Sequence, residues 1–148
     1  MAGYSGTPLI KKLGIKPGSN VVFVNAPSGY TAALDLPPDV ITNPRSGKPL
    51  DFAQLFVKNE SELRRKFSSY AERLNASGML WVSWPKKNSG VATDLSENVV
   101  RDIGLAAGLV DVKVCAVDEV WSGLKFVFRL KDRATVNPRS ALAAPRRC

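Results

Sequence analysis

The sequence predicts a three-layer α/β sandwich whose mostly parallel sheet ends in a C-terminal antiparallel hairpin strand. Short apolar runs alternate along the chain with segments of helical period, which is typical of β-α-β units with right-handed crossovers. The runs 21–24 and 79–84 are apolar throughout, as expected for strands covered on both faces. Residues 110–116 and 124–130 instead alternate apolar and polar side chains, which indicates a hairpin. We expect a single domain over residues 1–130.

The first third of the chain predicts two short helices and two strands. Thr7 is a candidate helix cap, Pro8 suits the first helical position, and Gly14 can end the helix. The elements expected next are a strand at 21–24, a polar loop at 25–29, a short helix at 30–34 and a short strand at 40–42.

The clearest helix of the sequence follows a predicted strand at residues 52–57. Either Asn59 or Ser61 caps this helix. Its apolar side chains recur at spacings of four, three and four residues, which is one stripe of a 3.6-residue period. That stripe consists of Leu63, Phe67, Tyr70 and Leu74. Ser77 and Gly78 end the helix, and the strand at 79–84 begins directly afterwards.

A second long helix is predicted over about residues 94–107. Asp94 and Glu97 have the spacing of a capping box, with Asp in place of the usual Ser or Thr. Gly108 suits the left-handed residue that follows a helix. The two alternating strands come next and are joined by the segment 118–123. Residues 131–148 are rich in Ala, Pro and Arg, and we expect them to form a disordered basic tail.

The 148-residue chain contains no histidine, and this excludes several kinds of chemistry. Ser-His-Asp and Cys-His nucleophile activation both need an imidazole, as do many metal sites. The two cysteines, Cys115 and Cys148, have neither the number of a disulfide framework nor the spacing of a zinc site. No apolar run approaches the ~20 residues of a membrane helix, and residues 1–8 lack the pattern of a signal peptide. We therefore expect a cytoplasmic protein without a metal centre.

The net charge of +8 is concentrated at the two ends of the chain. Residues 1–20 carry three lysines and no acid, and residues 131–148 carry five basic residues and one acid. The part between them is almost neutral. A domain that reads nucleic acid usually gathers Lys and Arg on one face or helix. The distribution argues against nucleic acid as a partner and leaves weak binding through the basic tail as the remaining route.

Four polar segments are expected to meet at the carboxyl edge of the sheet, where α/β proteins bind ligands. They are residues 25–29, 58–59, 86–90 and 118–123. Lys86 and Lys87 are expected to hold an anion beside the helix that begins near Thr93. The segment 118–123 would face them, with Trp121 as a stacking surface. The candidate ligand-binding residues are Asn25, Ser28, Gly29, Lys58, Lys86, Lys87, Asn88, Ser89, Thr93, Asp118, Glu119, Trp121 and Ser122.

Several of these residues also have a purely structural interpretation. Two lysines in a loop are more often solvated than bound to a ligand. Asp118 and Glu119 are more often part of a turn than a catalytic pair. Trp121 is equally consistent with a hairpin anchor and with a partner contact. Trp81 and Trp84 fit core packing better than a stacking platform.

Two resemblances bear on these residues. The layout from the strand 79–84 to the terminal hairpin resembles the C-terminal half of Rossmann-like methyltransferases. The chain is also similar to a bacterial family catalogued as domain of unknown function 3052. The segments that carry this second similarity are 1–9, 12–18, Leu80-Trp81-Val82-Ser83-Trp84-Pro85-Lys86-Lys87, 93–95 and 113–124. The methyltransferase resemblance implies an S-adenosylmethionine site, which usually requires a glycine-rich turn after the first strand. The chain has Asn25-Ala26-Pro27-Ser28-Gly29 at that point, and Thr42-Asn43-Pro44 where an acidic residue would hold the ribose.

These observations favour a non-catalytic Rossmann-like module. It would bind a small anionic ligand or a protein partner at the carboxyl edge, and the sequence identifies no cofactor. The first alternative is a divergent S-adenosylmethionine-dependent, methyltransferase-like enzyme. The second is weak nucleic-acid binding through the basic tail.

Overall fold

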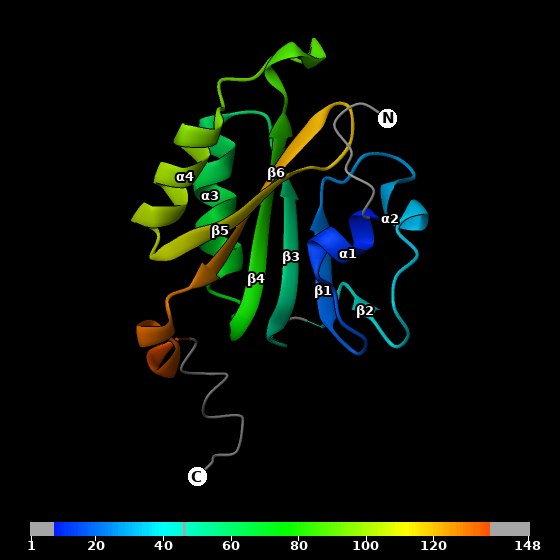
Figure 1. The fold of residues 1–148 in the computed structure, drawn as a ribbon. Coiled ribbons are helices and arrows are strands. Elements are labelled where there is room, and N and C mark those ends of the chain that lie inside the picture. Colours follow the sequence, from blue (N-terminus) through cyan, green and yellow to red (C-terminus); the bar gives the residue numbers. More distant parts are fainter. Residues whose placement is uncertain (1–7, 46, 137–148) are drawn as a thin grey trace.

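A six-stranded sheet in the order β2-β1-β3-β4-β6-β5 organises the protein (Figure 1). The computed structural model describes residues 8–45 and 47–136. Strands β1 to β4 are parallel, β6 is antiparallel to β4, and β5 is antiparallel to β6. The mostly parallel sheet and its terminal antiparallel pair are as predicted. The strands are β1 (Asn20–Val24), β2 (Ile41–Thr42), β3 (Leu50–Phe56), β4 (Leu74–Pro85), β5 (Leu109–Ala116) and β6 (Trp121–Phe128).

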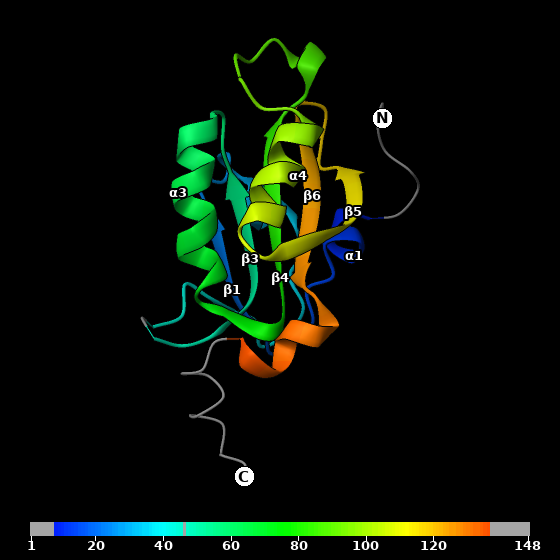
Figure 2. The same cartoon turned by 90° about the vertical axis from the view of Figure 1, so that its left-hand side faces the viewer.

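Helices cover both faces of this sheet and complete the three predicted layers (Figures 1 and 2). The longer helices α3 (Glu60–Ala71) and α4 (Glu97–Ala106) pack on one face, where Phe67 and Phe126 meet edge to face. The short helices α1 (Leu9–Leu13) and α2 (Tyr30–Ala33) cover the other face. Two 3₁₀ helices, η1 (Lys87–Ser89) and η2 (Leu130–Thr135), follow β4 and β6. Because both faces are covered, the central strands are almost entirely buried.

Trp81 fixes α1 to the sheet. Its indole Nε1 donates a 3.1 Å hydrogen bond to the carbonyl oxygen of Leu13, the last residue of α1. Gly14 then ends the helix with a φ of 82°, as its sequence position predicts. Pro8 stands at the N-cap position, and the predicted cap Thr7 lies outside the described residues. Both Trp81 and Trp84 are core residues, as their structural interpretation predicted.

The end of α3 and the start of β4 differ from the prediction. Helix α3 begins after the N-cap Asn59, whose side chain accepts from Glu62 N, but it ends at Ala71. Leu74, predicted as the last member of the helical stripe, is the first residue of β4 and pairs with Leu50 of β3. Gly78, predicted to end the helix, lies within β4, where an added Cβ would stand only 2.9 Å from Leu50 O. Pairing with β3 therefore extends this strand by five residues beyond its predicted start at Met79.

The predicted start of α4 is wrong by three residues. Ser96, not Asp94, is the N-cap, and its Oγ accepts from Val99 N at 3.3 Å. Asp94 instead caps the neighbouring helix α3, where its Oδ1 accepts from Glu60 N at 2.8 Å. The two helices thereby share one polar junction at the carboxyl edge of the sheet.

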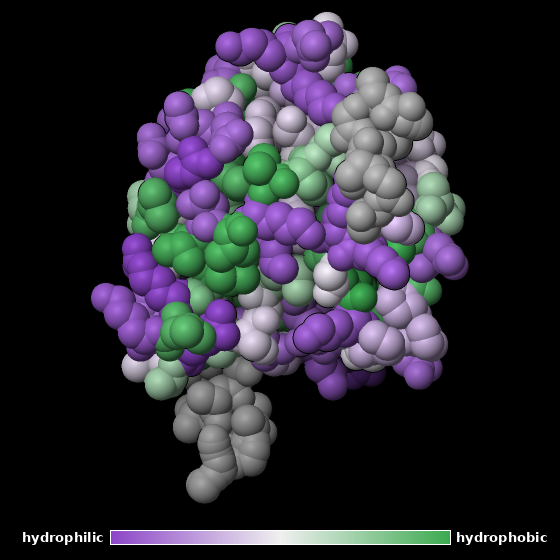
Figure 3. Space-filling model, viewed as in Figure 1, coloured by the Kyte–Doolittle hydropathy of each residue, from purple (hydrophilic) through white to green (hydrophobic). Residues whose placement is uncertain are grey.

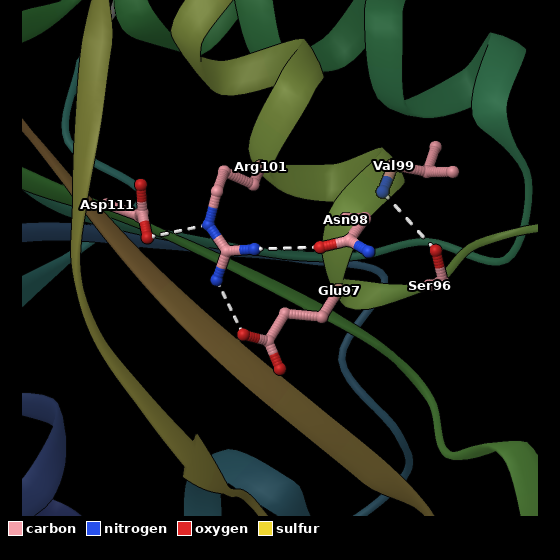
Figure 4. A network of polar contacts seen from close by, with 6 residues as sticks. All are labelled: Ser96, Glu97, Asn98, Val99, Arg101 and Asp111. Carbon is pink, nitrogen blue, oxygen red and sulfur yellow. Dashed lines mark hydrogen bonds and ion pairs between the residues drawn. The ribbon is translucent and has the colours of Figure 1, made fainter.

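Arg101 fastens α4 to the edge strand β5 (Figure 4). Its Nε donates to Asp111 Oδ2 at 2.9 Å, while its two terminal nitrogens donate to Asn98 and Glu97. The hydrogen bonds to Asp111 and then to Glu97 raise the pKa of Arg101. At the end of the described chain η2 covers Leu130–Thr135, and the rest of the predicted tail lies outside the described residues. None of the described helices has the length and apolar character required to cross a membrane.

Candidate functional site

The carboxyl edge of the sheet gathers the segments 25–29, 58–59 and 86–90, because β1, β3 and β4 are parallel and end there. The segment 118–123 joins them, since Lys86 N donates to Val120 O at 2.7 Å. The strand order reverses between β1 and β3, so this edge contains the switch point at which α/β sheets commonly bind ligands.

Three aromatic rings pack together beside this switch point. The rings of Tyr30 and Phe56 meet edge to face with centroids 4.9 Å apart, and Phe56 meets Trp121 in the same way at 5.1 Å. These three rings come from α2, β3 and β6, which are far apart in the sequence. We call Tyr30, Phe56 and Trp121 the aromatic crest. Trp121 is therefore a packed member of β6 that retains partial exposure, and the sequence had placed it in the turn.

A pocket of about 680 Å³ lies on the α1 side of the aromatic crest. Its walls come from the start of α1, the loop and short helix after β1, and the end of β5 with the turn that follows. Most of its lining is apolar, and Lys12, Asp35 and Asp118 provide charge. The residues that line it are Pro8, Leu9, Ile10, Lys12, Pro27, Ser28, Gly29, Tyr30, Ala33, Leu34, Asp35, Ala116, Val117 and Asp118. We call this space the α1 pocket.

A second pocket of about 450 Å³ lies on the α3 side of the crest. Two of its polar residues are hydrogen-bonded to each other. Asn25, which has a φ of 60°, donates from Nδ2 to Glu62 Oε2 at 3.2 Å. The same oxygen, Glu62 Oε2, also pairs with Lys66 Nζ at 3.0 Å. The residues that line this pocket are Asn25, Pro27, Phe56, Lys58, Glu62 and Trp121. The hydrogen bond between Asn25 and Glu62 links the residue that follows β1 to the first turn of α3.

A buried polar chain supports the aromatic crest from below. Tyr30 donates from its hydroxyl to Gln54 Oε1 at 2.9 Å, and Gln54 Nε2 donates to Ser83 Oγ at 3.0 Å. Gln54 and Ser83 are fully buried in β3 and β4. Their burial is tolerated because each is hydrogen-bonded. Sequence reasoning missed this chain, although a glutamine inside the apolar run 52–57 was a signal for it.

The candidate residues of the sequence divide between the two pockets and the surrounding turns. Ser28, Gly29 and Asp118 line the α1 pocket, and Asn25, Lys58 and Trp121 line the smaller one. Neither pocket is lined by the remaining candidates, which are Lys86, Lys87, Asn88, Ser89, Thr93, Glu119 and Ser122. Lys87 and Asn88 are exposed in η1, which projects beyond the sheet (Figure 1).

Two of the candidate residues stabilise turns. Thr93 donates from Oγ1 to Lys58 O at 2.6 Å and accepts from Leu95 N, which ties the start of α4 to the end of β3. Asp118 Oδ1 accepts from Val120 N and Trp121 N, both at 2.8 Å, as the turn interpretation of this residue predicts. The side chains of Thr93 and Asp118 are therefore committed to backbone groups.

Residues that sequence reasoning did not consider make up much of the α1 pocket. Leu9, Ile10 and Lys12 enter it because Trp81 anchors α1 on this face. No such anchor is visible in the sequence, where these residues read only as a short helix. Within the described part of the chain, no group of three or more Cys, Asp or Glu side chains is placed to hold a metal ion.

Several solved structures with similar folds are methyltransferases. A magnesium protoporphyrin IX methyltransferase from Synechocystis PCC 6803 with bound SAH is 14% identical over 82% of this chain and 78% of that chain, with a TM-score of 0.55. The fibrillarin pre-rRNA processing protein of Methanococcus jannaschii is 12% identical over 85% of this chain and 70% of that chain, with a TM-score of 0.58.

A third similar structure is an O-methyltransferase from neocarzinostatin biosynthesis in complex with S-adenosylmethionine. It is 14% identical over 86% of this chain but only 53% of its own length, with a TM-score of 0.63. No family model and no curated protein matches the chain, so its resemblance to the domain of unknown function 3052 family stays a prediction. The structural likenesses show that this chain has a methyltransferase-like Rossmann fold.

Proposed function

We propose that this methyltransferase-like Rossmann fold serves as a non-catalytic module that binds a small organic ligand in the α1 pocket. The observation that carries the proposal is the pocket itself, which has a volume of about 680 Å³ and a mostly apolar lining at the carboxyl edge. That volume suits a small molecule, and pockets of this composition use a few polar groups to orient their ligand. The charged residues of the lining are Lys12, Asp35 and Asp118. The ligand is therefore expected to have an apolar body with an anionic group that pairs with Lys12 and donor groups that face the two carboxylates.

The hydrogen bonds of the pocket support a binding role over a catalytic one. The Tyr30 hydroxyl donates to Gln54, and an oxygen of Asp118 accepts two backbone N–H groups of its turn. The Tyr30 hydroxyl and Oδ1 of Asp118 are thus both engaged in holding the local structure. The chain also has no histidine with which to activate a nucleophile.

The loop after β1 supports a ligand position displaced from the usual dinucleotide site. In Rossmann folds a glycine-rich turn after the first strand lets the protein backbone approach the cofactor closely. The segment Asn25-Ala26-Pro27-Ser28-Gly29 has one glycine, and Asn25 bridges to Glu62 across the space above the switch point. The ligand is therefore expected between α1 and α2, on the far side of the aromatic crest from α3.

Thermal shift measurements test this proposal on wild type and a matched pair of variants. The ligands screened are S-adenosyl compounds, nucleotides and organic phosphates. Ala33 lines the α1 pocket and Ala32 does not, although both are exposed on the same single-turn helix. A compound that stabilises wild type should stabilise Ala32→Trp equally and should lose its effect on Ala33→Trp. A double variant Lys86→Ala/Lys87→Ala should keep the response. If that double variant alone loses it, the ligand binds at η1 and the α1-pocket proposal is wrong.

The second candidate is an S-adenosylmethionine-dependent enzyme, and the similarity to methyltransferases that hold this cofactor favours it. Isothermal titration with S-adenosylmethionine and S-adenosylhomocysteine distinguishes the two. Binding with competition by adenosine compounds, together with methyl transfer to an acceptor, would support the enzyme. Absence of any heat at millimolar ligand would contradict it and leave the binding module.

A further inference from the structure

Lys113 and Lys125 lie directly opposite each other on the antiparallel strands β5 and β6. Like charges in directly opposed positions destabilise a strand pair. The register that opposes them is produced by a bulge, because Asp111 pairs with Phe126 and the next paired residue is Lys113. If Val112 were paired instead of bulged, the alignment that precedes the bulge would continue and place Lys113 opposite Leu124. Bulges often serve to re-aim a side chain next to a functional site.

Both lysines reach the C-terminal end of α1. Lys113 Nζ donates to the carbonyl oxygen of Lys12 at 3.1 Å. Lys125 Nζ stands 3.8 Å from the position that a Cβ on Gly14 would take. Lys16 follows Gly14 by two residues, and its positive charge acts on Lys125. We call Lys16, Lys113 and Lys125 the lysine cluster. None of these three residues lines the α1 pocket.

The charges of the lysine cluster are not balanced within the described residues. No carboxylate of residues 8–45 and 47–136 forms an ion pair with any of its three members. The pKa of Lys125 is lowered by burial first and then by the charges of Lys113 and Lys16. The Lys12 carbonyl uses one of the three protons of the Lys113 ammonium group, and the others stay available.

The surface around the cluster is apolar on one side. Val112 and Val114 of the edge strand β5 are exposed at 54% and 53%. An apolar patch over β5 is visible in Figure 3. The ammonium groups of Lys113 and Lys125 instead lie on the side of the hairpin that faces α1, where both reach the end of this helix.

We propose that Lys16, Lys113 and Lys125 form a binding site for a multivalent phosphate group at the C-terminal end of α1. An anion with several oxygens would accept hydrogen bonds from more than one ammonium group and relieve the repulsion between the opposed lysines. The compact arrangement fits a phosphate or diphosphate on a small molecule. A nucleic acid would instead need a row of cations that follows its backbone.

Titration with inorganic pyrophosphate at constant ionic strength tests the site. Wild type should bind, and Lys113→Gln and Lys125→Met should each bind about tenfold more weakly, the change expected for the loss of one charge-assisted hydrogen bond. Lys11→Gln is the matched control, since Lys11 is exposed on α1 outside the cluster. Equal pyrophosphate affinity in wild type and Lys113→Gln, or no affinity in wild type, would overturn the proposal.

A stability measurement without pyrophosphate separates binding from a structural role. If the lysines bind an anion, relief of their repulsion should make Lys113→Gln and Lys125→Met at least as stable as wild type. If they serve only to neutralise the end of α1, both variants should be less stable and the proposal fails. Ala33→Trp should leave pyrophosphate binding unchanged, so this site and the α1 pocket can fail independently.

The source of the phosphate is distinguished by three ligands tested in parallel. Tighter binding of a nucleoside diphosphate than of pyrophosphate would support a nucleotide as the source, and equal binding would support a free phosphate compound. Binding of a single-stranded oligonucleotide without binding of pyrophosphate would contradict the proposed compact site.

Discussion

The indole of Trp81 and the carbonyl of Leu13 join two completely buried residues that are 68 positions apart in the chain. This hydrogen bond holds the α1 layer against the centre of the sheet. Trp81→Phe keeps an aromatic ring but leaves the Leu13 carbonyl without its donor. The free energy of unfolding should fall by about 1–3 kcal/mol, the typical cost of a buried unsatisfied polar group.

Chemical denaturation of the Trp81 variant should be compared with that of Trp84→Phe. Trp84 is almost equally buried on the other face of the sheet, and its indole N–H has no hydrogen-bond partner within residues 8–45 and 47–136. Both variants lose ring volume, so the difference between them isolates the hydrogen bond. Equal destabilisation of the two would show that the bond to Leu13 contributes nothing net.

Gly104 is where α4 approaches the sheet most closely. A Cβ at this position would overlap the ring of Phe126. Gly104→Ala should therefore destabilise the protein by about 1–3 kcal/mol through overpacking, even though alanine is the better helix former. Thermal or urea unfolding measures the effect. Gly104→Ala should cost less stability in a Phe126→Leu background than in wild type, and an equal cost in both would mean that the strain lies elsewhere.

Ser83 accepts the hydrogen bond of Gln54 in the core. Ser83→Ala should cost about 1–3 kcal/mol, because the buried amide of Gln54 would lose its acceptor. Ser122→Ala is a suitable control, since Ser122 lies on the adjacent strand and is only half-buried. Urea denaturation of the two variants checks the prediction, which fails if they are equally stable.

Asp94 should stabilise α3 rather than α4. Its loss in Asp94→Ala removes the acceptor of Glu60 N and should cost about 1 kcal/mol, in the range of a lost helix cap. Amide hydrogen exchange should quicken in the first turn of α3 and stay unchanged in α4. Ser96→Ala should produce the opposite pattern, because Ser96 caps α4. Faster exchange in the first turn of α4 for Asp94→Ala would contradict the assignment.

Lys125 should make stability depend on pH in the alkaline range. Its folded-state pKa lies below the ordinary value of 10.5, chiefly through burial and then through Lys113 and Lys16. Between these two values the unfolded chain binds more protons, so the contribution of Lys125 to stability rises with pH in that window. Lys125→Met, compared with wild type at neutral pH in phosphate-free buffer, should be at least as stable. Its advantage should shrink as the pH approaches 10.5, and an advantage that stays constant over this range would contradict the prediction.

The order and type of the elements follow from the sequence because they depend on local patterns. Apolar runs predicted the central strands, alternation predicted the hairpin of β5 and β6, and one of the two expected caps, Asn59, marks the start of α3. The common carboxyl edge followed as well, since parallel strands must end on the same side. The hydrogen bond between Lys86 and Val120 then brings the last polar segment to that edge.

The tertiary structure alone decided which polar groups are free to meet a ligand. Asp94 has the spacing of a cap for its own helix, yet it caps α3 because the two helices pack side by side. Lys113 and Lys125 are ordinary residues of alternating strands until a bulge at Val112 sets them opposite each other. The α1 pocket exists because Trp81 binds the end of a helix 68 residues away. Such contacts depend on strand register and helix docking, which no local pattern of residues encodes.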